Sequence, residues 1–410
     1  MENKRKIIND PVYGFIQIGH EILFDLIEHP WFQRLRRIRQ LGLTHLVYPG
    51  ALHTRFQHSL GAMHLMGEAL RTIETKGHKI SSEDKLAAQI AILLHDIGHG
   101  PFSHALEFTI IRDTRHESMS KLLMDLLNHQ YQGQLTTAIS IFNNTHPRKF
   151  LSQLVAGQLD VDRLDYLSRD SFFTGVSEGV IGTQRIIKML NIYNNKLVAE
   201  EKGIHSIEKF ILARRIMYWQ VYLHKTVLAA ENLMILILRR ARYLSQQGEK
   251  LFASPALSYF LSSDGKPAEG LQEEFVDKFT QLDDFDILSA IKVWTSHPDP
   301  ILSYLASSLI RRNLPRCLIQ PKPFDYFYVE KIKEKIRGTF GIKEEDLQWF
   351  FVSNTTSNFS YRQGGETIEL LLKSGKVAEL TEMSDQFSPE LMHRLVIKHF
   401  ICFPREVSPL

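Results

Sequence analysis

The sequence predicts a mainly helical fold that carries a small α/β subdomain at its C-terminal end. Apolar residues recur at the three- and four-residue spacing of amphipathic helices over most of the first 245 residues. Patterns typical of strands and tight turns gather only near and after residue 320. A length of 410 residues, with 44% apolar and 23% charged residues, is ordinary for a globular protein with a large buried core.

The predicted helices follow one another through the first part of the chain. Residues 20–41 have apolar residues at helical spacing on both sides of Pro30, which interrupts the pattern. Residues 59–75 and 83–94 also predict helices, and the second is so apolar that we expect it to be buried. The same spacing continues in three further segments, 116–129, 160–172 and 206–245.

The second half of the chain differs from the first in composition and in predicted secondary structure. Residues 246–270 are richer in Gly, Ser and Pro, which is typical of a linker or a loose loop region. Residues 324–341 predict a short strand followed by a helix, and ETIELLLKSGKVAELTEM predicts two strands around the turn Ser374–Gly375. We therefore expect a catalytic body at 1–245, a helical extension at 246–319 and the α/β subdomain at 320–410.

Composition argues against several classes of protein. Lys and Arg number 49 against 46 Asp and Glu, so the net charge of +3 provides no bulk field for binding nucleic acid. The two cysteines, Cys317 and Cys402, are too few for a disulfide framework or a cysteine-based zinc site. The first residues are polar, unlike a signal peptide, and the apolar stretches are too short or too interrupted to span a bilayer. We expect a soluble cytoplasmic protein with no membrane partner.

Histidines and carboxylates cluster in a way that points to a metal ion. Four stretches stand out, PGALHTRFQHSLG (49–61), LLHDIGHGPFSH (93–104), RHE (115–117) and DVDRLDYLSRD (160–170). His95 and Asp96 directly follow the buried helix, and His58 and Asp162 would complete a set of two nitrogens and two oxygens. Such a set suits Fe, Mn, Zn or Ni and tolerates Mg. Each piece alone is weak, since about one His–Asp pair is expected by chance; the combination is the signal.

Together these motifs resemble the HD-domain metal-dependent phosphohydrolases, and more closely the deoxynucleoside triphosphate triphosphohydrolases that include the catalytic core of the SAM-and-HD-domain enzyme. The resemblance covers roughly residues 6–226. It implies that a divalent metal is held by His58, His95, Asp96 and Asp162. It also implies that His104 protonates the leaving 5′-oxygen and that Glu107, one helical turn later, orients His104. His99 and His116 match residues around the phosphates.

The resemblance further implies a set of substrate-binding residues. Phosphate contacts are matched by Arg55, Arg163 and Arg214. Gln40 and Leu41 match the pair that reads the 3′-hydroxyl and crowds the 2′ position, and Tyr166 and Asp170 match sugar contacts. Tyr222 matches a residue near the base, whereas Tyr218 stands where the vertebrate enzyme has His.

Regulation is implied less directly. Glu28 and Arg36 match residues that read a guanine at a regulatory subunit interface, while Glu200, Glu201 and Lys202 replace an Arg–Asp–Lys run. Because a phosphate-binding charge is reversed there, we expect a homo-oligomer, dimer or tetramer, with weaker or differently specific nucleotide activation.

The sequence therefore predicts hydrolysis of a deoxynucleoside triphosphate to a deoxynucleoside and inorganic triphosphate. One alternative is an HD phosphatase or phosphodiesterase that acts on nucleoside monophosphates or cyclic nucleotides. Another, from a different class, is a nucleotide- or nucleic-acid-binding regulator. The arginines and the Gln40–Leu41 pair favour a triphosphate, and the complete ligand set with His104 argues against a pure binding protein.

Overall fold

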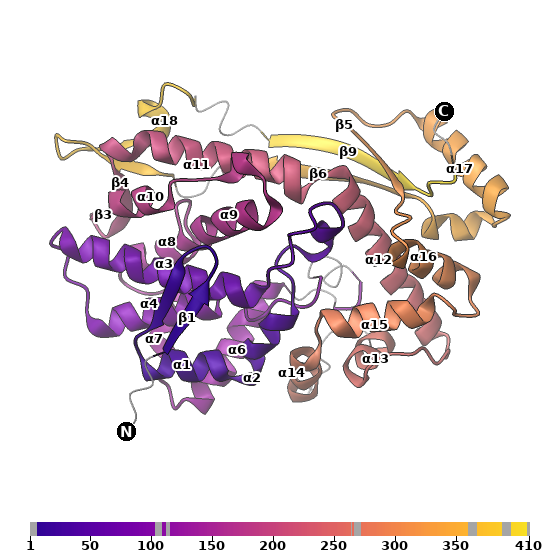
Figure 1. The fold of residues 1–410 in the computed structure, drawn as a ribbon, viewed down its shortest axis with the longest axis horizontal. Helices are drawn as coiled ribbons and strands as arrows, with labels where there is room; N and C mark the ends of the chain where they lie inside the picture. Colours follow the sequence, from indigo (N-terminus) through magenta and orange to yellow (C-terminus); the bar gives the residue numbers. More distant parts are fainter. Residues whose placement is uncertain are drawn as a thin grey trace.

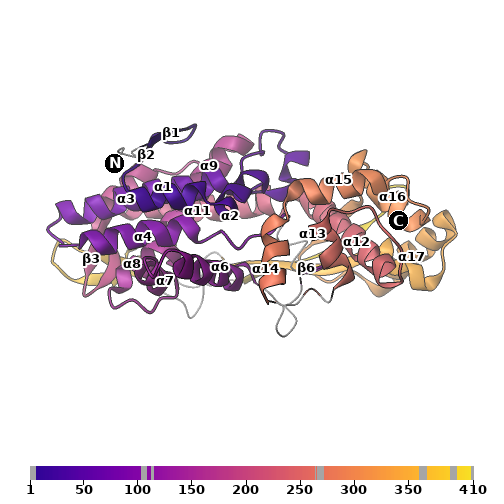
Figure 2. The ribbon, with the colours of Figure 1, turned by 90° about the horizontal axis from the view of Figure 1, so that it is seen from below.

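The computed structural model describes residues 6–102, 109–111, 115–263, 265, 272–359, 367–387 and 395–407. Within these residues the predicted mainly helical fold is confirmed, and the strands form three small sheets. The molecule is elongated, with the helices of the first half at one end and the later helices at the other (Figures 1 and 2).

The chain begins with a hairpin that the periodicity did not predict. Strands β1 (Lys6–Asp10) and β2 (Gly14–Ile18) pair antiparallel, and α1 (Glu21–Glu28) and α2 (Pro30–Gln33) follow. Pro30 occupies the first turn of α2, where its missing N–H costs no hydrogen bond. Tighter 3₁₀ turns follow at Arg34–Arg37 and Gly42–Leu46, so the helical pattern of 20–41 ends before residue 41.

Among the described residues, one long central helix and five others build the body. They are α3 (Arg55–Thr75), α4 (Ser82–Leu94), α6 (His116–Gln130), α7 (Thr136–Phe142), α8 (Lys149–Ala156) and α9 (Val161–Thr174). Helix α3 packs on both α4 and α9. The close approach of α3 and α9 requires Gly61, because a Cβ there would lie 2.0 Å from Asp165 Oδ1. This packing brings three sequence motifs to one place.

The prediction of one helical run over 206–245 is wrong. After α10 (Thr183–Met189) and the strands β3 (Leu190–Tyr193) and β4 (Lys196–Glu200), helix α11 spans Ile204–Met217. One turn of π-helix (Tyr218–Tyr222) follows, and the chain then bends by 56° at Leu223 and His224 before α12 (Lys225–Gln246). The periodicity did not reveal this bend, because the apolar spacing continues through it. The new helix begins where the His224 side chain accepts a hydrogen bond from the Thr226 N–H as its N-cap.

Beyond α12 the structure corrects two further expectations. The loose region expected at 246–270 contains helix α13 (Pro255–Ser262), because Ser254 and Pro255 act as helix cap and first residue rather than as loop breakers. No strand begins at residue 324, since Asp325 caps α17 (Tyr326–Phe340); the strand is the earlier β5 (Arg316–Gln320). Helices α14 (Gln272–Gln281), α15 (Asp284–Trp294) and α16 (Pro300–Ile310) lie between α13 and β5 in the chain.

The last strands join two different sheets. Strands β6 (Val352–Phe359) and β9 (Leu395–Phe403) form a three-stranded sheet with β5, in the order β5-β9-β6. The hairpin predicted around Ser374–Gly375 is present as β7 (Glu369–Leu371) and β8 (Val377–Glu379), followed by α18 (Leu380–Met383). This hairpin pairs in parallel with β4 of the body, so the C-terminal chain reaches both ends of the molecule (Figure 1). The proposed division into three parts stays a prediction.

No single helix among the described residues is long and apolar enough to cross a membrane, and only the bent pair Glu201–Tyr222 and Lys225–Gln246 meets that test by length and composition.

Candidate active site

Three helices bring the predicted metal ligands together. His58 comes from α3, His95 and Asp96 follow the end of α4, and Asp162 lies in the first turn of α9. His58 Nε2 lies 3.1 Å from Asp162 Oδ1 and 3.3 Å from His95 Nε2. Asp96 joins them through Oδ1, 3.3 Å from His95 Nε2, while its Oδ2 accepts from Arg55 at 2.5 Å. Ligand atoms of His58, His95 and Asp162 all lie within 4.8 Å of one another, as a single metal ion requires.

Both histidines are oriented through their other ring nitrogen. His58 Nδ1 lies 2.7 Å from Asp165 Oδ2, and His95 Nδ1 lies 2.6 Å from the carbonyl oxygen of Ile92. Each acceptor favours a proton on Nδ1, so the Nε2 lone pairs point to the shared centre. Metal-binding histidines are held in this way. The donor set therefore fits a divalent cation with nitrogen and oxygen ligands.

Electrostatics at this centre favour a positive charge. Burial alone would lower the pKa of His58, but hydrogen bonds with Asp162 and Asp165 outweigh it and raise that pKa to about 10. Burial acts to raise the pKa of Asp162, yet its contacts with His58 and His95 hold it far below the usual range. The carboxylates of Asp162 and Asp165 therefore stay ionised. Their negative charge stabilises either protonated histidines or a divalent cation at this centre.

His99 and His116 lie together beside the metal ligands. Their rings stack with centroids 3.9 Å apart, and His99 Nε2 lies 3.2 Å from Asp96 Oδ1. Burial and then the charge of Arg55 lower the pKa of His99 well below its ordinary value, so this ring is neutral. The turn that carries it is held by the buried Arg34, which donates to the carbonyl oxygens of Ile97 and His99.

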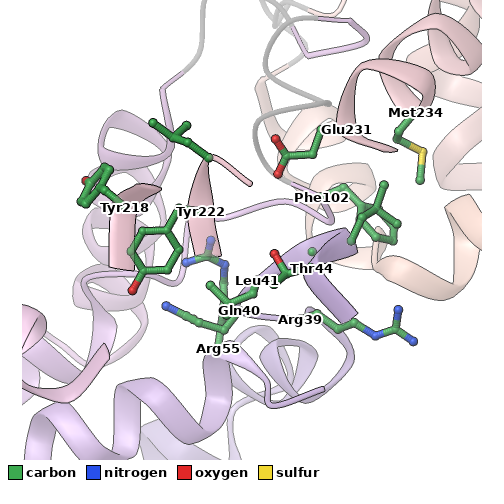
Figure 3. Close-up of a pocket in the computed structure, with 13 residues that line it drawn as sticks. Arg39, Gln40, Leu41, Thr44, Arg55, Phe102, Tyr218, Tyr222, Glu231 and Met234 are labelled. Atoms are coloured by element: carbon green, nitrogen blue, oxygen red, sulfur yellow. The ribbon is translucent and has the colours of Figure 1, made fainter. Parts of the chain in front are cut away.

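A cavity of about 250 Å³ adjoins this centre. Arg55 connects the two, since it binds Asp96 and also lines the cavity (Figure 3). The wall includes five predicted substrate residues, Gln40, Leu41, Arg55, Tyr218 and Tyr222. Gly42 also lines the cavity and adopts a φ of +49°, a left-handed conformation that favours glycine.

Two more predicted sugar contacts connect to the same wall. Asp170 accepts hydrogen bonds from the Tyr222 hydroxyl at 2.7 Å and from His53 Nε2 at 2.8 Å. The Tyr166 ring packs edge-on against Tyr222, with centroids 6.3 Å apart. Asp170 is almost fully buried, so it holds Tyr222 in position from behind.

The three predicted phosphate-binding arginines differ in their surroundings. Arg55 is bound to Asp96, and Arg163 donates to Asp160 and to the carbonyl oxygen of Gly157. Arg214 influences the pKa of Tyr166, as Arg163 does, which places it at the same site. Its Nε is buried without a partner, and no side-chain hydrogen bond or ion pair of Arg214 is found among the described residues. Arg214 is therefore the arginine that remains free for an anion.

Comparison with known proteins now identifies the family. The HD domain family matches residues 55–170, and the HD-associated region matches residues 181–250. The chain belongs to the HD-domain phosphohydrolases. A crystal structure of a phosphohydrolase from Bacteroides thetaiotaomicron is 47% identical with a TM-score of 0.95, and the match covers 98% of this chain and 100% of that one.

Two relatives illustrate the range within the family. The uncharacterized protein YwfO of Bacillus subtilis is 30% identical over 394 residues, which are 93% of this chain and 88% of the relative. The deoxynucleoside triphosphate triphosphohydrolase SAMHD1 of Danio rerio is 31% identical over 266 residues, which are 54% of this chain and 42% of the relative. The HD chain thus spans less than half the length of that triphosphohydrolase.

The remaining predicted residues are two catalytic and two regulatory candidates. His104 and Glu107 are outside the described residues. Glu28 is exposed at the end of α1, and the exposed Arg36 lies over the Phe56 ring, 3.6 Å from its centroid, and donates to Gln33. Neither Glu28 nor Arg36 lines the cavity, so a nucleotide that regulates the protein through them would bind at the surface.

The structure adds residues that the sequence reasoning missed. Asp165, His53 and Arg34 position the HD motif residues from behind, and Glu231 lines the cavity. Asp165 follows Asp162 by three positions, so the helical spacing of DVDRLDYLSRD placed it near the ligand face. The other three carry no signal in their local sequence, because their partners lie far away along the chain.

Proposed function

We propose that this HD-domain phosphohydrolase hydrolyses deoxynucleoside triphosphates to deoxynucleosides and inorganic triphosphate. The observation that carries the proposal is the junction at Arg55, where a centre of two histidines and two aspartates meets a cavity lined by Gln40, Leu41 and two tyrosines. The likeness to the deoxynucleoside triphosphate triphosphohydrolase SAMHD1 supports the same choice of substrate.

The charges near the cavity suit a triphosphate. Its charge of about −4 needs cationic partners, and arginine provides them with fixed N–H donors. In our proposal Arg214 takes the first such contact, because its guanidinium is not already bound to a carboxylate among the described residues. Arg163 and Arg55 would exchange part of their contacts with Asp160 and Asp96 for phosphate oxygens.

The proposed ligands of the divalent metal are His58, His95, Asp96 and Asp162. When bound, such an ion lowers the pKa of water and neutralises charge on phosphate oxygens. Around it the chain would provide a neutral His99, stacked on His116, at the phosphates. His104 would protonate the departing 5′-oxygen, with Glu107 orienting it.

Selection of the sugar follows from the Gln40–Leu41 pair at the cavity wall. In the proposal Gln40 reads the 3′-hydroxyl, and the Leu41 side chain occupies the space that a 2′-hydroxyl would need. Asp170 holds Tyr222 by the 2.7 Å hydrogen bond and Tyr166 packs against that ring, so the sugar would meet a rigid wall.

The test is a chromatographic product assay on the full chain with each deoxynucleoside triphosphate and with Mn, Fe, Ni, Zn or Mg. We expect deoxynucleoside and inorganic triphosphate in equal amounts. Stepwise release of phosphate would instead assign a phosphatase. Activity on nucleoside monophosphates or cyclic nucleotides alone would assign the HD phosphatase or phosphodiesterase named above. Binding without turnover for every metal would assign a nucleotide-binding regulator.

Assembly belongs to the same proposal. Glu28 and Arg36 are exposed and so available to a nucleotide between subunits of a dimer or tetramer. Glu200 is paired with Lys76 at 2.8 Å and Lys202 at 2.7 Å, which offsets its charge. Sedimentation and initial rates with and without GTP test this; we expect weak activation, and strong activation abolished by Arg36→Ala would contradict it.

A further inference from the structure

Glu231 is an acidic residue of α12 whose carboxylate has no partner among the described residues and faces the cavity. It lines the same space as Gln40, Leu41 and Tyr222, and its carboxylate faces that space in Figure 3. No hydrogen bond or ion pair of the Glu231 carboxylate is found in the described part of the chain, and burial raises the pKa of this group to about 7. A carboxylate so placed is costly unless a ligand satisfies it.

The surroundings of Glu231 are mainly apolar. Phe102 and Met234 line the cavity near it, whereas Arg55 and the tyrosines Tyr218 and Tyr222 lie across the cavity in Figure 3. Binding sites of this kind use a few polar groups in an apolar wall to fix the orientation of a ligand. Since Arg55 marks the side of the metal ligands, Glu231 lies on the side that the far end of a nucleotide would reach.

We propose that Glu231 reads the hydrogen-bonding edge of the nucleobase and selects guanine. This rests on the proposed function, because it assumes that a nucleotide enters with its phosphates toward Arg55. A carboxylate offers two adjacent acceptors, and guanine offers two adjacent donors, N1–H and the N2 amino group. Thymine presents one N–H between two carbonyl oxygens, so a carboxylate opposite that edge is repelled. Adenine and cytosine each pair a donor with an acceptor and satisfy only one carboxylate oxygen.

The first experiment compares kcat/KM for dGTP and dTTP in the wild type and in Glu231→Gln. The amide keeps the shape but replaces one acceptor with a donor. We expect the ratio of kcat/KM values, dGTP over dTTP, to fall by on the order of 10–100-fold, which is the discrimination of one bidentate pair. Glu249→Gln, which removes a carboxylate 49% exposed beside His297, is the matched control and should leave the ratio unchanged. An unchanged ratio in Glu231→Gln would overturn the proposal.

A second measurement separates this proposal from the proposed reaction. Equilibrium dialysis of dGTP and dTTP against the full chain in EDTA reports base selection without turnover. Selective dGTP binding that Glu231→Gln abolishes supports the base reading even if no triphosphate is released. Equal binding of both nucleotides, with normal triphosphate release, would reject the base reading and leave the proposed reaction intact.

The two cysteines carry a second inference, which does not depend on the reaction. Cys317 of β5 and Cys402 of β9 are direct partners in the antiparallel register, and both are buried. Directly opposed residues point to the same face with Cα atoms about 4.5–5.5 Å apart, within the range that a disulfide spans. The thiols are hydrogen-bonded to each other, which lowers the pKa of Cys317.

We infer that this pair is an oxidation site that forms a cross-strand disulfide. With hydrogen peroxide as oxidant, Cys317 as thiolate attacks one oxygen and gives a sulfenic acid and hydroxide, which forms water with the proton that the Cys317 thiol had lost. The thiol of Cys402 then displaces the second oxygen as water, so two thiols and one peroxide give one disulfide and two waters. Leu228 and Ala229 of α12 pack on the pair, so the cross-link forms beneath the helix that carries Glu231.

Peptide mapping of peroxide-treated protein without reduction tests the inference. We expect one cross-linked peptide pair, lighter by two hydrogens, which dithiothreitol separates, and we expect a higher Tm for the oxidised protein. Cys317→Ser should abolish the cross-link. Independent sulfinic acids on both cysteines, or thiols that stay unreacted while a denatured sample reacts, would contradict the inference.

Discussion

Replacing Asp165 with Asn should weaken metal binding without touching a predicted ligand. The Asp165 carboxylate is fully buried and lies 2.7 Å from His58 Nδ1, where it holds the ring and increases the basicity of Nε2. Asparagine fills the same volume and can still accept from Nδ1–H, but it lacks the charge. Loss of such an outer contact costs metal affinity by about 10–100-fold, which is about 1.4–2.8 kcal/mol.

A matched variant separates this effect from a loss of stability. Asp165 also pairs with Arg169 at 3.0 Å, and Arg169 pairs with Asp10 at 2.8 Å on its other side. Asp10→Asn therefore weakens the same buried arginine network without contacting His58. Both variants should lower the Tm, but only Asp165→Asn should raise the Kd for Mn²⁺ in a calorimetric titration of the full chain. Equal Kd values in the two variants would refute the reasoning.

Four further predictions follow from the site and its packing. Asp96→Ala should keep the fold but lose metal and activity together, as metal analysis and circular dichroism would show; full metal occupancy would remove Asp96 from the ligand set. His104→Ala should lower kcat on the order of 10²–10⁴-fold with little change in substrate binding, and near-normal turnover would exclude it as the acid. Leu41→Gly should narrow the preference for deoxyribonucleotides over ribonucleotides, measured as a ratio of kcat/KM values; an unchanged ratio would place the selection elsewhere. Gly61→Ala should destabilise the protein by about 1–3 kcal/mol or more in urea unfolding, because the new Cβ would lie 2.0 Å from Asp165 Oδ1, and wild-type stability would contradict this packing.

The sequence alone determined the main helices and the residues of the candidate centre. Helices α3, α4, α6 and α9 lie where the apolar spacing predicted them, within a few residues. Their buried faces are encoded by neighbours three and four positions apart, so short windows of sequence are sufficient. His95 and Asp96 stood out because they directly follow a buried helix, and the resemblance to the HD family implied the full set with His58 and Asp162. Their joint placement agrees with the prediction, while their role as ligands stays a prediction.

Only the tertiary structure decided which distant segments meet. The hairpin β7–β8 was predicted from its turn, but its pairing with β4 was not, because an alternating pattern specifies a strand and not its neighbour. The bend between α11 and α12 was hidden for a similar reason, since both helices are apolar on their buried faces. The contact of Asp165 with His58 and the entry of Glu231 into the cavity join residues from different helices. Such contacts depend on how whole helices pack, and no short stretch of sequence encodes that packing.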